Sequence, residues 1–394
     1  MPTKVIAAIL SFLSFFALWN PKSQPNRIPE TRTYEGEVQA GTDMPADKYG
    51  VWPTKGFETA PRPLWLSPPV LEAAMMYKGL YNINLLNDSV LVLYKGKLVY
   101  ENYAAGWDKD TTHMMASVSK SVLSALVGIA IGEGKIKGVD QKVLDFYPEA
   151  RKLPGWQESK ADMTVEHLLT MTSGLPDDRT ATDYKWWEAD DTGLASFLAP
   201  QVTKPGEKFA YNTGTGCQTL ACLVSRAVGK NLFAYAKEKL FGPLGMTSVT
   251  WDAPADGRNY GGMGVHMTPR DMLRFGYLYL NNGRWEGKQI FPAWWAAQSG
   301  PLGKRPHAYG RLFWNVDLLP FDSSYEAEGA MGQYICILPE YDAVVVRTGS
   351  AGPIVRAMAG TEGATLDFLI GLLPLKNLPV DYLKYKIFLA RPGD

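Results

Sequence analysis

Residues 114–124 read MMASVSKSVLS and place serines and a lysine at the start of an otherwise apolar run. From Ser117 to Glu133 apolar residues recur on one helical stripe, and glycines at positions 132 and 134 close it. This pattern predicts a helix that faces a core. Ser117 and Lys120 lie three positions apart, so on that helix they share one face, about a turn apart and within reach of each other.

Ser117 stands where a nucleophile would be well placed. In the first turn of a helix, free backbone N–H groups and the positive end of the dipole favour an oxyanion that forms on a carbonyl under attack. Burial of Lys120 removes its solvation and favours the neutral amine, which can accept the serine proton. The alternative is that Ser117 caps the helix while Lys120 extends to water. A single S-x-x-K tetrapeptide has low specificity.

The composition is that of an ordinary globular protein, with 394 residues, 46% of them hydrophobic and 20% charged. Lys plus Arg total 40 and so do Asp plus Glu, so no net charge favours nucleic acid, and we expect a small-molecule partner. The cysteines form neither a CxxC pair nor an even set, and we interpret them as small buried hydrophobic residues. They are Cys217, Cys222 and Cys336.

The N-terminal residues predict targeting. Lys4 precedes the apolar run from Val5 to Trp19, after which the chain turns polar and rich in proline. The run is shorter than the roughly 20 residues that span a bilayer comfortably. We therefore interpret residues 1–24 as a signal or membrane anchor and expect an extracytoplasmic protein, secreted or attached to the membrane by this segment. The alternative is a buried N-terminal helix.

The order of strand and helix patterns predicts one sheet with an insertion. Residues 25–84 carry many prolines and few periodic apolar stretches, which indicates an extended segment. The stretch SVLVLYKGKLVYENY (89–103) predicts a hairpin that turns at Lys95–Lys97. Helical patterns fill about 140–290, and RLFWNVDL, QYICILP and AVVVRTG then predict strands, before TLDFLIGLLPL, which suits a closing helix. We expect an α/β (α+β) fold with an antiparallel sheet, flanking helices and an inserted all-helical lobe.

Other catalytic patterns are absent or poor. The sequence contains no G-x-S-x-G, H-E-x-x-H or G-x-G-x-x-G motif, and GGMG at 261–264 does not open onto a phosphate-binding signature. No cluster has metal-ligand spacing. A Ser/His/Asp triad remains conceivable, but nothing pairs a histidine with an orienting acid, so we expect structural or surface roles for the histidines. They are His113, His167, His266 and His307.

Several stretches, in order, resemble the β-lactamase-related serine hydrolases, the superfamily of class C β-lactamases, penicillin-binding proteins, family VIII esterases and 6-aminohexanoate-dimer hydrolases. They are ASVSKSVLSALVGIAIGEGKI, VEHLLTMTSGLP, KPGEKFAYNTGTGCQTLACLVSRAVGKN, TPRDMLRFGYLYLNNGRWEGKQI and EGAMGQYICILPEYDAVVVRTG. The resemblance implies a β-lactamase/penicillin-binding-protein-like domain over residues 85–394, with the helical lobe at about 140–290. It implies neither a metal nor a cofactor.

The resemblance assigns Tyr211 to the tyrosine of the family's Tyr-x-Asn motif. It implies that Tyr211 moves protons between Ser117 and the leaving group, whereas the alternative is a packed aromatic ring. The motif's third position departs from the family pattern, because Thr213 replaces the usual asparagine and so keeps a hydroxyl but loses an amide. We expect Thr213 to contact the substrate.

A second departure lies in AEGAMGQYI, where the family's third motif is often Lys-Thr-Gly or His-x-Gly. Neither lysine nor histidine is present at 329–332, which removes an anchor for a β-lactam carboxylate and disfavours antibiotic hydrolysis. The small Gly329 and Ala330 would let a substrate carbonyl approach a backbone N–H, which with the Ser117 N–H would form the oxyanion hole. The letters RTG at 347–349 mimic Lys-Thr-Gly, but they end the following strand.

Together these features predict a serine hydrolase that cleaves an ester or amide through an acyl-enzyme. Ser117 is the nucleophile, Lys120 and Tyr211 transfer protons, and Gly329 and Ala330 bind the substrate carbonyl.

The alternatives are a penicillin-binding protein or peptidase, a β-lactamase-type activity, an acyltransferase and a non-catalytic binding protein. Four aromatic residues are candidates for an apolar pocket, with ordinary packing as the alternative: Tyr184, Trp186, Trp187 and Tyr325.

Overall fold

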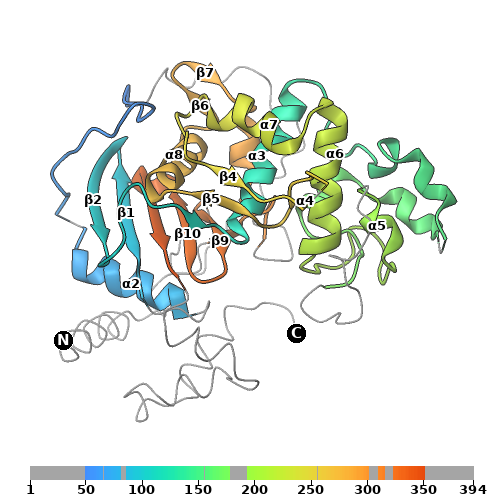
Figure 1. The fold of residues 1–394 in the computed structure, drawn as a ribbon, viewed down its shortest axis with the longest axis horizontal. Coiled ribbons are helices and arrows are strands. Elements are labelled where there is room, and N and C mark those ends of the chain that lie inside the picture. The colour runs from blue at the N-terminus through green and yellow to red at the C-terminus, as the bar shows by residue number, and fades with distance from the viewer. Residues whose placement is uncertain are drawn as a thin grey trace, which may run out of the picture.

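A six-stranded antiparallel sheet forms the centre of the molecule, in the order β2-β1-β11-β10-β9-β8 (Figure 1). The computed structural model describes residues 49–350 except 65, 81–85, 155, 178–192, 255, 301–308 and 316–322. Strands from both ends of this range meet in one sheet, because β1 pairs with β11. The strands are β1 (Ser89–Tyr94), β2 (Lys97–Tyr103), β8 (Trp314–Asn315), β9 (Tyr325–Gly329), β10 (Gln333–Leu338) and β11 (Ala343–Thr348).

The predicted hairpin joins β1 to β2. Tyr94 pairs with Lys97, and the two residues between them have positive φ angles, 49° at Lys95 and 78° at Gly96. Positive φ at both central residues is the geometry of a tight turn whose twist matches the two strands. Local sequence alone therefore accounts for this turn.

Both faces of the sheet are covered, which explains the unbroken apolar run of β1. Leu91 and Leu93 point into the larger core with helices α3 (Val118–Gly132) and α8 (Pro269–Leu280). Val90 and Val92 point into a smaller core on the other face. Successive side chains of a strand face opposite sides, so a strand buried on both sides reads as continuously apolar.

Helix α2 (Pro68–Leu80) covers that second face, within the range predicted to be extended. Leu71 and Met75 lie one turn apart on the same side of the helix and are buried with Val90 and Val92. Two apolar residues four positions apart lie on one side of a helix and can pack together on the sheet. The prolines at the start of α2 are tolerated because the first turn of a helix has free N–H groups. The extended prediction for 25–84 therefore differs from the structure in this part.

Short helices lie beside the sheet, and of these α4, α5 and α6 are at the right of Figure 1. They are η2 (Val143–Asp145), η3 (Pro148–Lys152), η4 (Glu158–Asp162), α4 (Val165–Leu169), α5 (Ala195–Leu198), η6 (Thr213–Cys217), α6 (Gln218–Val228), α7 (Leu232–Ala236) and η7 (Lys237–Phe241). Helix α8 falls within the range predicted for the helical lobe, yet it packs on β1, β10 and β11. It therefore belongs to the layer that covers the sheet.

The remaining described elements are small. Strands β3, β5 and β4 form a three-stranded sheet, and β6 pairs with β7. Their bounds, with those of the last helices, are β3 (His113–Met114), β4 (Thr250–Trp251), β5 (Val265–Met267), β6 (Arg284–Trp285), β7 (Lys288–Gln289), α9 (Ala293–Ala297) and η8 (Pro339–Tyr341). Strand β3 leads directly into the loop before α3, so this small sheet supports the start of that helix.

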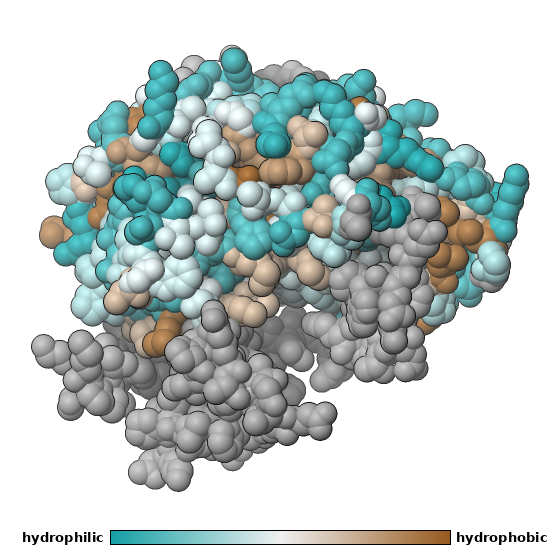
Figure 2. All heavy atoms as spheres, in the orientation of Figure 1, coloured by the Kyte–Doolittle hydropathy of each residue, from teal (hydrophilic) through white to brown (hydrophobic). Residues whose placement is uncertain are grey.

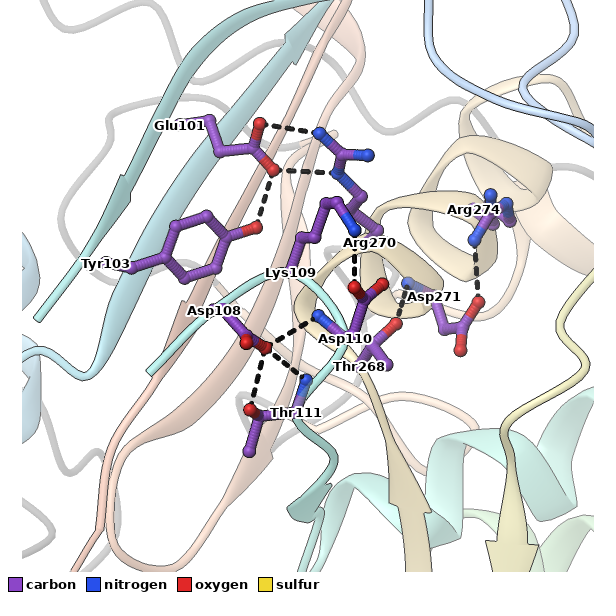
Figure 3. A network of polar contacts seen from close by, with 10 residues as sticks. All are labelled: Glu101, Tyr103, Asp108, Lys109, Asp110, Thr111, Thr268, Arg270, Asp271 and Arg274. Atoms are coloured by element: carbon purple, nitrogen blue, oxygen red, sulfur yellow. Dashed lines mark hydrogen bonds and ion pairs between the residues drawn. The ribbon is translucent and has the colours of Figure 1, made fainter. Parts of the chain in front are cut away.

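A polar network ties edge strand β2 to the first turn of α8 (Figure 3). Arg270 donates from Nε and Nη2 to the two carboxylate oxygens of Glu101, at 2.8 Å each, and the Tyr103 hydroxyl donates to the same carboxylate. Burial raises the pKa of Glu101, but these donors outweigh it and hold the pKa below its ordinary value. The bidentate contact of Arg270 with Glu101 fixes the angle between β2 and α8.

Among the residues that the structure describes, no helix combines the length and the apolar character needed to cross a membrane. The predicted signal or anchor at 1–24 and the predicted closing helix TLDFLIGLLPL lie outside the described residues. Figure 2 shows that the described part of the viewed face is mostly hydrophilic, with apolar side chains in small groups.

Candidate active site

Ser117 lies at the junction between a strained loop and helix α3. The preceding residue, Ala116, has a φ of 45°, which is uncommon for a residue with a side chain. Ser117 itself has helical φ and ψ, and its hydroxyl makes no capping hydrogen bond. Its side chain is partly exposed, whereas the helix residues that follow it are buried. The hydroxyl is therefore accessible and is not used as a helix cap.

Lys120 is buried and points to Ser117. Only 1% of its surface is exposed, and its Nζ donates to Ser117 Oγ at 2.8 Å and to the Gly262 carbonyl at 2.9 Å. The alternative in which Lys120 extends to water is therefore wrong. The geometry places an amine nitrogen within hydrogen-bonding distance of an accessible serine hydroxyl, as a general base requires.

Gly262 is a part of this site that the sequence analysis missed. A Cβ atom at this position would lie 2.5 Å from Thr213 Cγ2 and 3.4 Å from Lys120 Cε. Only a residue without a side chain lets the carbonyl come this close to the amine. The same contact brings Thr213 next to Lys120. The signal in the sequence was the GGMG cluster, which marks a close backbone approach.

Tyr211 packs against the lysine. The Nζ of Lys120 lies 4.9 Å from the centre of the Tyr211 ring. Trp314 stacks on this ring with centroids 5.8 Å apart, and Tyr309 meets it edge-on at 6.2 Å. The backbone N–H of Tyr211 donates to Asp177 Oδ2 at 3.1 Å. Trp314 and Tyr309 thus hold the Tyr211 ring beside Lys120. The sequence had not indicated these two residues as its neighbours.

The residue after Tyr211 fixes the local backbone. Asn212 is 1% exposed, and its Nδ2 donates to the Pro176 carbonyl at 2.6 Å. Its Oδ1 accepts from Thr215 Oγ1 and from the Gly216 N–H, which orders the start of η6. A buried amide with partners on both ends restrains the chain on either side of it. Asn212 therefore helps to set the direction of the neighbouring Tyr211.

The end of β9 packs against the loop before Ser117. A Cβ atom on Gly329 would lie 2.3 Å from the Met115 carbonyl oxygen, so the two backbones touch here. Among the described residues, neither the Ser117 N–H nor the Ala330 N–H donates a backbone hydrogen bond. The two predicted oxyanion donors therefore lie on segments that are in contact.

The described histidines have partners other than Ser117. His113 is buried and stacks on Trp107 with centroids 4.2 Å apart. The Nδ1 of His167 accepts from the Thr164 N–H at 3.2 Å, and His266 Nε2 lies 3.0 Å from the carboxylate of Asp252. No hydrogen bond joins a histidine to Ser117 in the part of the chain that the structure describes. His307 lies outside that part.

For Tyr325, a candidate for the apolar pocket, the structure shows the alternative, ordinary packing. This residue is 6% exposed and packs in the core, edge-on against Phe313 and Tyr279. Its side chain points to the face of the sheet that α3 and α8 cover. Ala327 lies two positions further along β9 and is in the same core. Tyr184, Trp186 and Trp187 lie outside the described residues. No disulfide joins the three cysteines, all of which lie in the described part of the chain; Cys217 and Cys336 are buried as predicted, whereas Cys222 is half-buried.

Burial lowers the pKa of His113 to about 4 from an ordinary 6.5. As the pH falls below 6.5, the unfolded chain takes the proton first, so stability present above that pH is lost on descent toward pH 4. The shift corresponds to about 3 kcal/mol of unfolding free energy. Burial raises the pKa of nearby Asp88, which opposes this loss in the acidic range.

We expect His113→Phe, which keeps a stacked ring but cannot be protonated, to lose less stability than wild type between pH 7.5 and 4. Denaturant unfolding at each pH measures the difference. The comparison variant is His266→Gln, which removes a partly exposed histidine instead. A His113→Phe curve parallel to that of wild type would contradict the assignment.

Comparison with known proteins agrees with this fold. The beta-lactamase family matches residues 79–358, more than half of the chain, and the chain therefore belongs to the beta-lactamase family. It shares with this family the character of a serine hydrolase. The family and the fold class expected from the sequence are both confirmed.

Three relatives illustrate the range of the family. The 6-aminohexanoate-dimer hydrolase of Paenarthrobacter ureafaciens is 24% identical over 306 residues, which are 71% of this chain and 76% of that protein. A solved family VIII carboxylesterase is 18% identical with a TM-score of 0.55, covering 72% of this chain and 92% of its own. A penicillin-binding protein homologue from Caulobacter crescentus is 16% identical with a TM-score of 0.58, covering 74% and 93%. At these identities the solved structures show the fold alone.

Proposed function

We propose that this protein cleaves an ester or amide bond through an acyl-enzyme formed on Ser117. The observation that carries the proposal is the 2.8 Å contact between Lys120 Nζ and Ser117 Oγ, made by a buried amine and an accessible hydroxyl. A nucleophile and a base in hydrogen-bonding contact are the signature of covalent catalysis. The aromatic ring of Tyr211 against the same amine adds a second group that can carry a proton.

In this mechanism Ser117 Oγ attacks the carbonyl carbon while its proton passes to Lys120, directly or through Tyr211. The N–H groups of Ser117 and Ala330 stabilise the oxyanion of the tetrahedral intermediate. The intermediate collapses when the leaving alcohol or amine takes the proton, which leaves the acyl group on Ser117. Water then attacks the acyl-enzyme, the same groups transfer protons in reverse, and the carboxylic acid is released.

The end of β9 favours an uncharged or simple acyl substrate over a β-lactam. The sequence here is Ala327-Glu328-Gly329. Neither residue before Gly329, whose backbone contacts Met115, carries a positive charge. A β-lactam carboxylate would find no cationic side chain on β9 to pair with. The names of similar proteins include a 6-aminohexanoate-dimer hydrolase and a carboxylesterase, and acyl-enzyme chemistry on a serine can cleave either an amide or an ester bond.

We also propose that residues 1–24 direct the protein out of the cytoplasm or attach it to the membrane. The apolar run from Val5 to Trp19, preceded by Lys4, supports this role. The substrate would then be met in the extracytoplasmic space. Fractionation of cells that express the full chain tests the location.

A fluorophosphonate probe tests the proposed chemistry, because it reacts with an activated serine. We expect one adduct per chain, located on Ser117 by peptide mass spectrometry, together with turnover of p-nitrophenyl acetate and butyrate. Heat-denatured protein is the control and should not be labelled. Absence of both labelling and turnover would refute the catalytic function and favour a binding protein.

The same preparation separates the hydrolase from its alternatives. Labelled penicillin should leave no long-lived adduct, and nitrocefin should be turned over more slowly than the esters. A stable penicilloyl adduct on Ser117 would instead favour a penicillin-binding protein. Faster turnover in the presence of an added alcohol, with formation of a new ester, would favour an acyltransferase.

A further inference from the structure

The sequence motif Arg347-Thr348-Gly349 ends β11, away from the position of the family's third motif, and the mechanism above does not use it. Arg347 is nevertheless one of the largest fully buried side chains among the described residues, with 0% exposure. A buried guanidinium is costly unless each of its donors is satisfied. Its partners therefore indicate what the residue does.

The three nitrogens of the guanidinium reach three different acceptors. Nη1 donates to the Gly332 carbonyl at 2.6 Å, Nε to Asn87 Oδ1 at 2.6 Å, and Nη2 to the Leu86 carbonyl at 2.9 Å. Asn87 in turn donates to the carboxylate of Glu72 on α2 at 2.7 Å. Arg347 thus joins the turn after β9 to the segment before β1.

The turn that Arg347 holds is the one that carries Ala330. The Gly332 N–H donates to the Gly329 carbonyl at 3.2 Å and closes the turn between β9 and β10. Met331 and Gly332 have φ angles of 64° and 85°. Positive φ is strained for methionine, and such a backbone persists only where its surroundings enforce it.

Gly332 is also shaped to accept the guanidinium. A Cβ atom at this position would lie 1.6 Å from Arg347 Nη1, so any side chain would displace the arginine. The other two residues of the motif, Thr348 and Gly349, link the end of β11 to the first residues of its neighbouring strands β1 and β10. Thr348 Oγ1 lies 2.6 Å from Ser89 Oγ, and Gly349 exchanges hydrogen bonds with the side chain of Gln333, the first residue of β10.

We propose that Arg347 is a positioning residue that fixes the 329–332 turn, so that the Ala330 N–H points at the oxyanion formed on Ser117. This inference rests on the proposed function. Arg347 touches no reacting atom, and its effect passes through the Gly332 carbonyl to the turn. Misdirection of one oxyanion donor weakens binding of the tetrahedral intermediate more than binding of the substrate.

The test compares the turnover of p-nitrophenyl butyrate with the affinity for an arylboronic acid, which forms a charged tetrahedral adduct on serine. For Arg347→Met we expect kcat to fall about 10- to 100-fold and boronate affinity to fall in parallel, with KM nearly unchanged. Arg347→Lys, which can still donate to one or two of the carbonyls, should retain more kcat than Arg347→Met but less than wild type.

A matched control is Lys160→Met. Lys160 is also buried, with 1% exposure, and donates to the Phe197 and Ala199 carbonyls at 2.7 Å each. Loss of this cation should lower stability while kcat and boronate affinity stay at wild-type values. The control thus separates the positioning role from the general cost of removing a buried cation.

Gly332→Ala keeps the experiment decisive if Arg347→Met does not fold. Its Cβ would push the guanidinium away, so we expect the same parallel loss of kcat and boronate affinity. Wild-type kcat and boronate affinity in either folded variant would overturn the role of Arg347, as would a rise in KM alone. If the wild-type protein itself neither labels with fluorophosphonate nor turns over esters, the proposed function and this inference both fail.

Discussion

The Ser117→Ala protein is expected to fold normally and to lose ester turnover by at least about 10⁴-fold. The oxygen that forms the acyl-enzyme is removed, and no other described hydroxyl bonds to Lys120. The unfolding free energy should fall by no more than about 1–3 kcal/mol, because the Ser117 hydroxyl makes no capping hydrogen bond but does accept from the buried Lys120 Nζ. Loss of activity in a protein that still folds is the result that distinguishes a nucleophile from a structural serine.

The measurement is p-nitrophenyl butyrate turnover, alongside fluorophosphonate labelling and thermal unfolding of the same samples. Ser124→Ala is the matched control, since Ser124 lies buried in the body of the same helix. It should be labelled and should turn over substrate like wild type. A Ser117→Ala protein that keeps more than a tenth of wild-type turnover would show that another residue is the nucleophile.

The second large effect concerns Lys120. We expect Lys120→Met to lower kcat/KM about 10³-fold, because general-base assistance contributes roughly 10²–10⁴. Methionine is similar in length and apolar, so it can occupy the buried space and removes a buried amine. The Gly262 carbonyl would lose its donor, at a cost of about 1–3 kcal/mol in unfolding free energy. The variant should therefore fold but react slowly.

Lys120→Arg separates proton transfer from charge alone. Arginine keeps the positive charge but remains protonated, so it cannot accept the proton of Ser117. We expect it to be nearly as slow as Lys120→Met in acylation, measured by stopped-flow release of p-nitrophenol. Lys160→Met, which removes a buried amine remote from the serine, should acylate at the wild-type rate. Wild-type acylation by Lys120→Arg would mean that Lys120 acts only through its charge.

The sequence determined the parts of this protein that depend on local geometry. Three positions are less than one helical turn, so the spacing of Ser117 and Lys120 places their side chains together in any helix. The Lys95-Gly96 pair specifies the β1–β2 turn in the same way. Resemblance to a family then supplied Tyr211, whose distance along the chain gives no local signal.

Only the tertiary structure decided what surrounds that pair. Gly262, Tyr211 and Trp314 reach Lys120 or its neighbours from segments far away in sequence, and Arg347 on β11 reaches Gly332 at the start of the neighbouring strand β10. These contacts depend on the order β1-β11-β10-β9, which brings the late strands beside the first one. Strand order is set by burial of both sheet faces over the whole domain, and helix or strand periodicity carries no information about it.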